Sequence, residues 1–312
     1  LDVTSETGIT ASRDGAQFSA SNSKMFSCFD KGWFVALTGE FLEKQATSRG
    51  GTYLGTIFDP DKTIDDGIIS SQGISRDDYG MKIGEAAATS GIAAYNMELP
   101  LSDVAKFYSF GDLGHRRGSS AGFRRFPKEI EKNVPDFYPR GFLPLIEPTI
   151  DDAAITVGIK RKGDWNVDTS LTHGRNSFTF NIEDSVNASL GTASPTTFDA
   201  GTLAFDQTVA DVDLLHKLDQ KELTAVNLVL GSELRVERYR IEAGDEASYL
   251  NGPETYDVMG VPQDKVPGAQ VFPGFQPSNE VDRRRDSIGL YAGLESELTK
   301  KIALDIGGRF EH

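Results

Sequence analysis

The sequence predicts an all-β protein built on one large antiparallel sheet, and three patterns support this prediction. Apolar residues recur at every second position over long segments, which is the side-chain period of a β-strand. Short polar turns alternate with long polar loops, so successive antiparallel strands place all the turns at one end of the sheet. No apolar run approaches the roughly 18 residues that a membrane helix needs. Together these features are typical of a transmembrane β-barrel, whose strands meet lipid with alternate residues.

The connections fall into two classes by length. The short turns lie at 30–32, 101–103, 162–164, 219–221 and 299–301. The long stretches lie at 46–89, 119–149, 183–201 and 243–282. Aromatic residues such as Trp33 and Trp165 stand beside short turns, where a barrel carries its interfacial girdle. We therefore expect the short turns on the periplasmic side and the long loops on the extracellular side.

About eleven strands are expected from the alternation, beginning with 1–11 and 16–28 and ending with 302–310. In the segment 224–240, for example, Leu228 and Leu230 are expected to face lipid and Asn227 to face the interior. Single-chain bacterial barrels have even strand numbers, and a sheet with two open edges does not survive in lipid. The chain is therefore expected to form a partial barrel, with residues 1–312 in one domain.

A change of parity predicts a bulge in one strand. Between Trp165 and Ile182 the apolar residues move from odd to even positions. A β-bulge inserts one residue and shifts the alternation in this way, so we predict a bulge near His173 and Gly174.

A soluble antiparallel sandwich is the main alternative, because its strands also alternate apolar and polar residues. Sandwich strands are short and their loops are of similar length at both ends, whereas here the loops segregate by length. The net charge of −15 argues against nucleic-acid binding. Cys28 is the only cysteine, and the four histidines lack metal-ligand spacing, so we expect neither a cofactor nor a metal site.

Two short motifs suggest chemistry that their context does not support. Residues 118–122 match the G-x-S-x-G nucleophile elbow, but basic polar residues flank them in place of a buried strand and a helix, so we predict no catalytic Ser120. The acidic segment 59–67 invites a calcium interpretation, yet Ile64 and Ser70 occupy the positions where an EF-hand loop needs Gly and Glu. We expect a non-enzymatic protein and an acidic exposed loop, and leave weak divalent-cation binding open.

The long loops combine aromatic residues with proline and glycine. Exposed aromatic side chains supply stiff contact surface at modest entropic cost, so they are candidates for ligand contact. The alternative is that they pack the loops on one another. The candidate ligand-contact residues are Phe272, Phe275, Tyr249, Tyr256, Phe137 and Tyr138.

Residues 232–245, followed by 268–275, resemble barrel strands and loops of TonB-dependent outer-membrane receptors. The stretches 178–191 and 205–207 have the same character, and the resemblance extends from about Trp33 onward. It implies a barrel of about 22 strands, of which this chain holds about half, filled by an N-terminal plug domain that contacts TonB. The family imports iron-siderophores, cobalamin, haem or carbohydrates. The chain departs from the pattern because it shows no plug, no TonB-contact motif and no terminal strand ending in an aromatic residue.

The resemblance thus implies an outer-membrane receptor that takes up a scarce nutrient, such as an iron-siderophore, cobalamin or a carbohydrate, and whose partners are lipid, a small ligand and the TonB complex. Two alternatives remain open. One is a passive porin or structural outer-membrane barrel without energy coupling, and the other is a soluble β-sheet enzyme or adhesin module.

Overall fold

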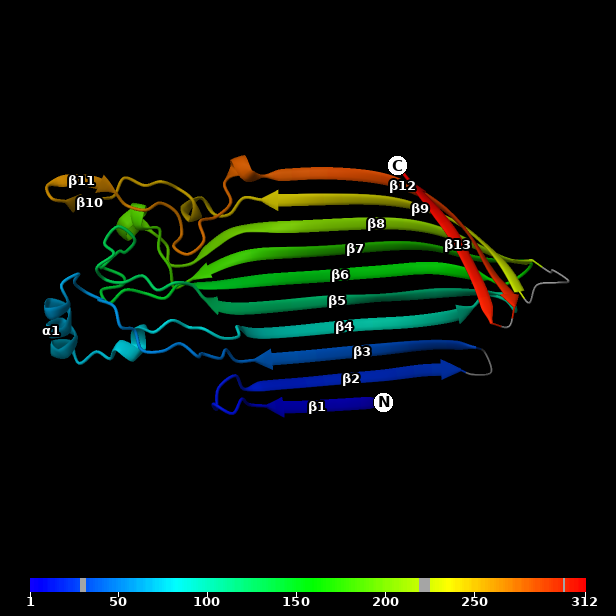
Figure 1. Ribbon diagram of the computed structural model, residues 1–312, viewed down its shortest axis with the longest axis horizontal. Helices are drawn as coiled ribbons and strands as arrows, with labels where there is room; N and C mark the ends of the chain where they lie inside the picture. The colour runs from blue at the N-terminus through cyan, green and yellow to red at the C-terminus, as the bar shows by residue number, and fades with distance from the viewer. Residues whose placement is uncertain (29–31, 219–224, 300) are drawn as a thin grey trace.

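The computed structural model describes residues 1–28, 32–218, 225–299 and 301–312. These residues form one antiparallel sheet of eleven strands in which neighbours in the sheet follow chain order (Figure 1). The strands are β1 (Asp2–Gly8), β2 (Gln17–Cys28), β3 (Trp33–Lys44), β4 (Ala87–Pro100), β5 (Ala105–Ala121), β6 (Leu145–Arg161), β7 (Trp165–Glu183), β8 (Phe198–Leu218), β9 (Ala225–Glu242), β12 (Val281–Thr299) and β13 (Ile302–Glu311). The predicted all-β class and strand number are confirmed.

The connections segregate by length, as expected (Figure 1). The long loops share one end of the sheet, called here the loop end, and the turns share the other, called the turn end. The predicted turn positions 30–31, 219–221 and 300 lie outside the described residues. The loops hold α1 (Lys62–Gln72), η2 (Arg76–Tyr79), η3 (Ala188–Ala193), η4 (Glu246–Ser248), η5 (Pro277–Asn279) and the separate hairpin of β10 (Thr255–Val258) and β11 (Val261–Asp264).

Among the helices that the structure describes, none is both long enough and apolar enough to cross a membrane.

The strand pairing gives the sheet one apolar face and one polar face. Residues that pair directly across antiparallel strands lie on the same face. Leu230 pairs with Leu214 and Ala292, which continues a row of apolar residues across three strands. On the opposite face, acidic and tyrosine side chains follow one another from strand to strand. The predicted assignment of Leu228 and Leu230 to the apolar face and of Asn227 to the polar face agrees with this pairing.

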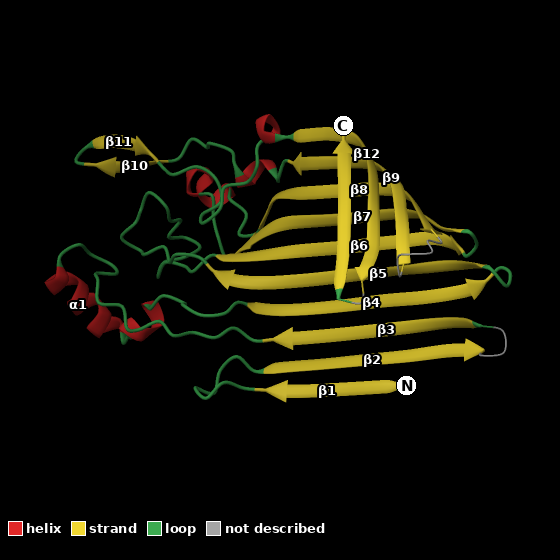
Figure 2. Ribbon diagram, turned by 45° about the vertical axis from the view of Figure 1, so that its right-hand side comes forward, coloured by secondary structure: helices red, strands yellow, loops and turns green. Residues whose placement is uncertain are grey.

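The polar face is the concave one. Figure 2 shows β12 and β13 curling in front of the other strands. On the polar face, side chains reach over an intervening strand to bond with the next strand but one, which requires the strands to curve toward that side. These contacts join Tyr108 to Asp168, Tyr291 to Asp213 and Arg309 to Glu233.

Glycines in the intervening strands make these contacts possible. The ring of Tyr108 lies over Gly158, where an added Cβ atom would come within 2.3 Å of the ring. The ring of Tyr291 covers Gly231 in the same manner, at 2.1 Å. A side chain at either glycine would displace the tyrosine. These contacts on the polar face therefore require glycine at both positions.

The predicted bulge near His173 and Gly174 is wrong. Strand β7 pairs with β6 in one continuous register from Val167 to Glu183. The change of parity has another cause: the apolar residues move from one face to the other. His173 lies on the apolar face, whereas Phe178 and its even-numbered successors lie on the polar face, where loop residues cover them.

Candidate ligand-binding site at the loop end of the sheet

Three of the long loops pack into one body over the loop end of the sheet. In loop 243–280, the Gln270 N–H donates to the carbonyl of Val186 at 3.0 Å. The ammonium of Lys265 in the same loop donates to the carbonyl of Asn133 at 2.9 Å. These bonds tie loop 243–280 to loops 184–197 and 122–144. We call the assembly, together with loop 46–86, the loop body.

Loop 46–86 joins the loop body through its own small core. Ile57, Ile69 and Tyr79 are buried there. The ring of Tyr53 stacks on Phe126 of the next long loop at 4.6 Å between centroids. Aromatic pairs of this kind add to the stabilisation that comes from burial alone.

Helix α1 shapes loop 46–86, and local sequence explains where it begins and ends. Asp61 is the N-cap: its carboxylate accepts the N–H groups of Thr63 and Ile64, which are left free at a helix start. Gly73 ends the helix in the left-handed region with φ of 61°, where glycine is favoured. The acidic segment 59–67 therefore includes a capped helix start.

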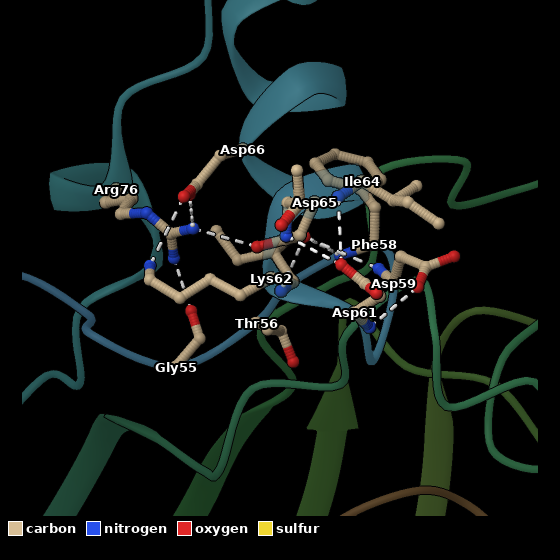
Figure 3. Close-up of polar contacts among 12 residues, drawn as sticks. Gly55, Thr56, Phe58, Asp59, Asp61, Lys62, Ile64, Asp65, Asp66 and Arg76 are labelled. Atoms are coloured by element: carbon tan, nitrogen blue, oxygen red, sulfur yellow. Dashed lines mark hydrogen bonds and ion pairs between the residues drawn. The ribbon is translucent and has the colours of Figure 1, made fainter.

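A buried carboxylate anchors α1 to the preceding chain (Figure 3). Asp65 has a fully buried side chain, and its Oδ1 accepts the N–H groups of Ile57 at 2.9 Å and Phe58 at 2.7 Å. Its Oδ2 lies 2.8 Å from the Arg76 guanidinium, which also pairs with Asp66. Burial opposes ionisation of Asp65, but these hydrogen bonds and Arg76 outweigh it and hold the pKa of Asp65 below its usual value.

The calcium interpretation of segment 59–67 finds no support in this geometry. Asp61 caps the helix, Asp65 is engaged by backbone N–H groups and Arg76, and Asp59 accepts the N–H of Asp61 at 2.7 Å. In the part of the chain that the structure describes, no group of three or more His, Cys, Asp or Glu residues could hold a metal ion.

Two of the predicted ligand-contact residues, Phe272 and Phe275, come together over the polar face. The ring of Phe272 stacks on Phe180 of β7 at 4.7 Å, and Phe275 meets Phe180 edge to face at 6.0 Å. Phe180 belongs to the polar face, and fully buried Ile182 lies two residues along the same strand. Loop 243–280 thus covers the polar face at its loop end.

The other four candidates stand apart from this cluster. Tyr138 packs against Phe142 at 4.7 Å, in a core that joins loops 122–144 and 184–197. Phe137 leaves 39% of its surface exposed. Tyr249 is half-buried beside η4, and Tyr256 is half-buried in the β10–β11 hairpin. Ligand contact by the six candidate residues stays a prediction. In the structure, Phe272, Phe275 and Tyr138 pack the loops.

Buried polar groups hold the loop body in one arrangement. The Asn187 amide is fully buried and donates to the carbonyls of Ala247 at 2.9 Å and Leu250 at 2.8 Å. Its oxygen accepts the Ser189 hydroxyl at 2.7 Å. A buried amide that is satisfied on both sides costs little and fixes the relative position of the segments that it joins.

A pocket of 400 Å³ opens on the polar face over strands β4 to β8, and no sequence motif predicts it. Asn176 in this pocket donates to Asp152 at 2.6 Å. Arg116 is exposed and makes no ion pair or side-chain hydrogen bond with any residue that the structure describes. On the other side of the pocket, Gln207 and Phe205 of β8 supply an amide and a ring. The pocket therefore offers an unpaired guanidinium, an amide and a ring to a ligand, beside the carboxylates of Asp112 and Asp152.

The turn end of the polar face has a larger hollow of 850 Å³ with many charged groups. Lys106 pairs with Glu98 at 2.6 Å, and Lys160 lies 3.4 Å from Asp168. Charges of both signs therefore line the concave side along its length. This surface suits water or a polar domain rather than lipid.

The G-x-S-x-G match lies within a strand. Ser120 belongs to β5 and pairs with Ile146 of β6. A nucleophile elbow needs a sharp turn between a strand and a helix, which this position does not provide.

No family model and no curated protein matches this sequence. Two solved structures resemble the fold along nearly its whole length. The open form of the ferric-catecholate import receptor Fiu from E. coli K12 matches 98% of this chain and 49% of its own at 11% identity, with a TM-score of 0.50. The closed form matches 98% of this chain and 45% of its own at 12% identity, with a TM-score of 0.51. The chain spans about half the length of Fiu, and its fold is that of a partial outer-membrane β-barrel.

Proposed function

We propose that the 312 residues form one domain, about half of the barrel of a TonB-dependent outer-membrane receptor that imports a scarce small nutrient. The observation that carries the proposal is the division of the sheet. An apolar convex face suits lipid, and a polar concave face suits a water-filled or plug-filled interior. The loop body then lies on the extracellular side, and the short turns lie on the periplasmic side.

Energy coupling is part of the proposal. A plug domain, which is not among the described residues, would fill the concave side and contact the TonB complex. The charged hollow at the turn end, with Lys106, Glu98 and Asp168, supports a polar occupant there. Ligand capture would take place at the loop end, between the loop body and the pocket that contains Arg116.

Of the three nutrient classes, an anionic iron-siderophore fits this pocket best. The free guanidinium of Arg116 can form charge-assisted bonds to oxygen anions, and Phe205 offers a ring face. Neutral carbohydrates would leave the Arg116 charge without a partner. The fold likeness to a ferric-catecholate import receptor supports the same choice.

The test uses cells that express the complete reading frame and lack other siderophore receptors. Uptake of radioactive iron bound to an anionic siderophore should occur, and a protonophore should abolish it. Replacing Arg116 with Gln should weaken binding by about tenfold, since hydrogen bonds to charged groups are among the strong ones. The control Arg284→Gln changes an exposed arginine of β12 on the apolar face and should leave binding unchanged.

Uptake that persists in the presence of the protonophore would identify a passive porin. Recovery of the chain in the aqueous fraction without detergent would identify a soluble module. Equal uptake by the wild type and the Arg116→Gln variant would remove this pocket from the ligand path.

A further inference from the structure

The pocket that contains Arg116 also holds a carboxylate without a partner. Asp112 lines the same pocket, lies four residues before Arg116 on β5 and is exposed on the same face. Its side chain makes no ion pair and no hydrogen bond with any residue that the structure describes. Two opposite charges on one strand are therefore both left unpaired.

The strand pairing explains why Asp112 stays unpaired. It lies opposite Ala94 of β4 and Ala154 of β6, and Ala154 in turn lies opposite Gly174 of β7. None of these residues has a side-chain donor. Arg116 is too distant, because four residues along a strand separate two Cα atoms by roughly 13 Å. The neighbouring strands thus leave the Asp112 carboxylate open to the pocket.

A second carboxylate gives the pocket a surplus of negative charge. Asp152 lies opposite Gly114, so it is the diagonal neighbour of both Asp112 and Arg116, a position roughly 7 to 8 Å away. Asp152 accepts the Asn176 amide at 2.6 Å rather than the Arg116 guanidinium. An anion bound at Arg116 alone would therefore lie near two carboxylates.

The two other titratable residues of the pocket lining do not offset this surplus. His115 and Arg175 stand at positions of β5 and β7 that belong to the apolar face. His115 contacts Asp151 at 2.6 Å, and Arg175 lies 3.8 Å from Asp206. The charges on the polar face of the pocket are thus two carboxylates and one guanidinium.

Glycines keep the space between the opposite charges open. Gly114 lies between Asp112 and Arg116 on β5, and an added Cβ atom there would meet its nearest neighbour, the Cβ of Asp152, at 3.6 Å. At Gly174 the nearest atom would be 3.8 Å away. Both distances are ordinary van der Waals contacts. One ligand can therefore extend from Arg116 to Asp112 without a side chain between them.

We propose that the ligand of this pocket is zwitterionic: an anionic siderophore that also carries a protonated amine, with its anion at Arg116 and its amine at Asp112. The inference rests on the proposed function, because it narrows the ligand class assigned to the same pocket. A bound ammonium group would offset the surplus negative charge, and it would gain a charge-assisted hydrogen bond to a carboxylate that has no other partner.

The experiment uses the complete protein purified from membranes in a neutral detergent and two synthetic tricatecholates loaded with radioactive iron. The first probe carries a free primary amine on a flexible arm. In the second probe that amine is acetylated, which removes its charge. The wild type should bind the amine probe about tenfold more tightly in equilibrium dialysis, because hydrogen bonds to charged groups are among the strong ones.

Four variants assign this preference to a residue. Asp112→Asn should abolish the preference and still bind the acetylated probe, whereas Asp112→Glu keeps the charge and should keep the preference. The matched control Asp305→Asn removes an exposed carboxylate of the polar face on β13, outside this pocket, and should behave like the wild type. Arg116→Gln should weaken both probes alike, since both carry the anion.

Equal binding of the two probes by the wild type would overturn this inference and leave the proposed function standing. The same holds if the preference for the amine survives in Asp112→Asn, because another group would then recognise the amine. If the wild type binds neither probe, the anionic siderophore of the proposed function is contradicted, and the inference falls with it.

Discussion

The loop body and the sheet bury their apolar side chains by different means. Each of the three buried apolar clusters contains loop residues, and fully buried side chains such as Ile57, Val186 and Asn187 lie in the loops. In the sheet, by contrast, Leu113 and Leu234 leave 64% and 55% of their surface exposed. The loops thus bury apolar side chains against one another. The apolar face of the sheet, by contrast, can be buried only by the medium around the protein.

This reverses the usual arrangement, in which a sheet carries the core and loops lie over the surface. A loop body with a core and a buried polar network can hold a ligand site in place without the ligand. In the eleven-stranded sheet, backbone hydrogen bonds join each strand to its neighbour from β1 to β13, so the sheet is a stiff support for the loop body. The contrast predicts that substitutions in the loop body change the stability of the loops themselves. Substitutions on the apolar face of the sheet should instead change stability in lipid.

The largest effect is expected where a buried ion pair is broken in the loop body. Asp65→Asn leaves the Arg76 guanidinium without its buried partner, and removing one partner of such a pair costs roughly 3 to 5 kcal/mol. Because the pair lies in loop 46–86, the loss should appear as local opening there. Hydrogen exchange by mass spectrometry should show faster exchange of amides in 56–79, with the amides of β5 to β9 unchanged.

The control for that prediction is Asp66→Asn, which removes an exposed partner of the same arginine. The Asp66 side chain is 51% exposed, so its pair with Arg76 should contribute less than about 1 kcal/mol. Equal effects of the two variants would mean that burial of Asp65 does not organise the loop.

The next effect belongs to the sheet and depends on lipid. Leu230→Arg places a charge on the apolar face and should cost about 2 to 4 kcal/mol in vesicles, whereas Asn227→Arg on the polar face should cost little. Asn227 already lies 3.3 Å from Glu295, which would accept the new cation. Denaturant titration of the complete protein in lipid vesicles measures both, and equal penalties would contradict a lipid-facing apolar side.

Gly231, which also lies on the polar face, is unsuitable for such a variant because the Tyr291 ring lies directly over it.

A smaller effect is expected from filling space beneath a tyrosine of the polar face. Gly158→Ala forces the Tyr108 ring away and lengthens its 2.8 Å bond to Asp168, and overpacking of this kind costs about 1 to 3 kcal/mol. The control Gly308→Ala adds a Cβ atom in open space and should change stability far less. If both variants unfold at the same denaturant concentration, the tyrosine contacts do not stabilise the sheet.

The sheet could be predicted from the sequence because its side-chain period of two is local and repeats over many residues. The alternation in 224–240 places Leu228 and Asn227 on opposite faces with no knowledge of their neighbours. The predicted bulge at His173 failed for the opposite reason. Whether Phe178 and Phe180 face lipid or a covering loop depends on residues nearly a hundred positions away, such as Phe272.

Most of the structure of the loop body could not be predicted from the sequence. Asp61 and Gly73 are local signals that mark the ends of α1, and attention to caps could have found that helix. The partnership of Asp65 with Arg76 and the placing of Arg116 in a pocket depend on contacts across loops and strands. No periodic pattern carries such contacts, so only the folded chain brings these residues together.

Lowering the pH is expected to produce the smallest of these effects, and this effect concerns the loop body. The pKa of Asp65 is lower in the folded loop than in an unfolded chain, where a carboxyl titrates near about 3.9. Its ionised form therefore stabilises the folded loop above that value, and this contribution is lost as the pH falls through the folded-state pKa. Exchange protection of 56–79 should stay level from pH 7 to about pH 5 and decrease below about pH 4. The Asp65→Asn variant should lack this acid dependence, and a decrease of the same size in that variant would assign the effect to other carboxyls.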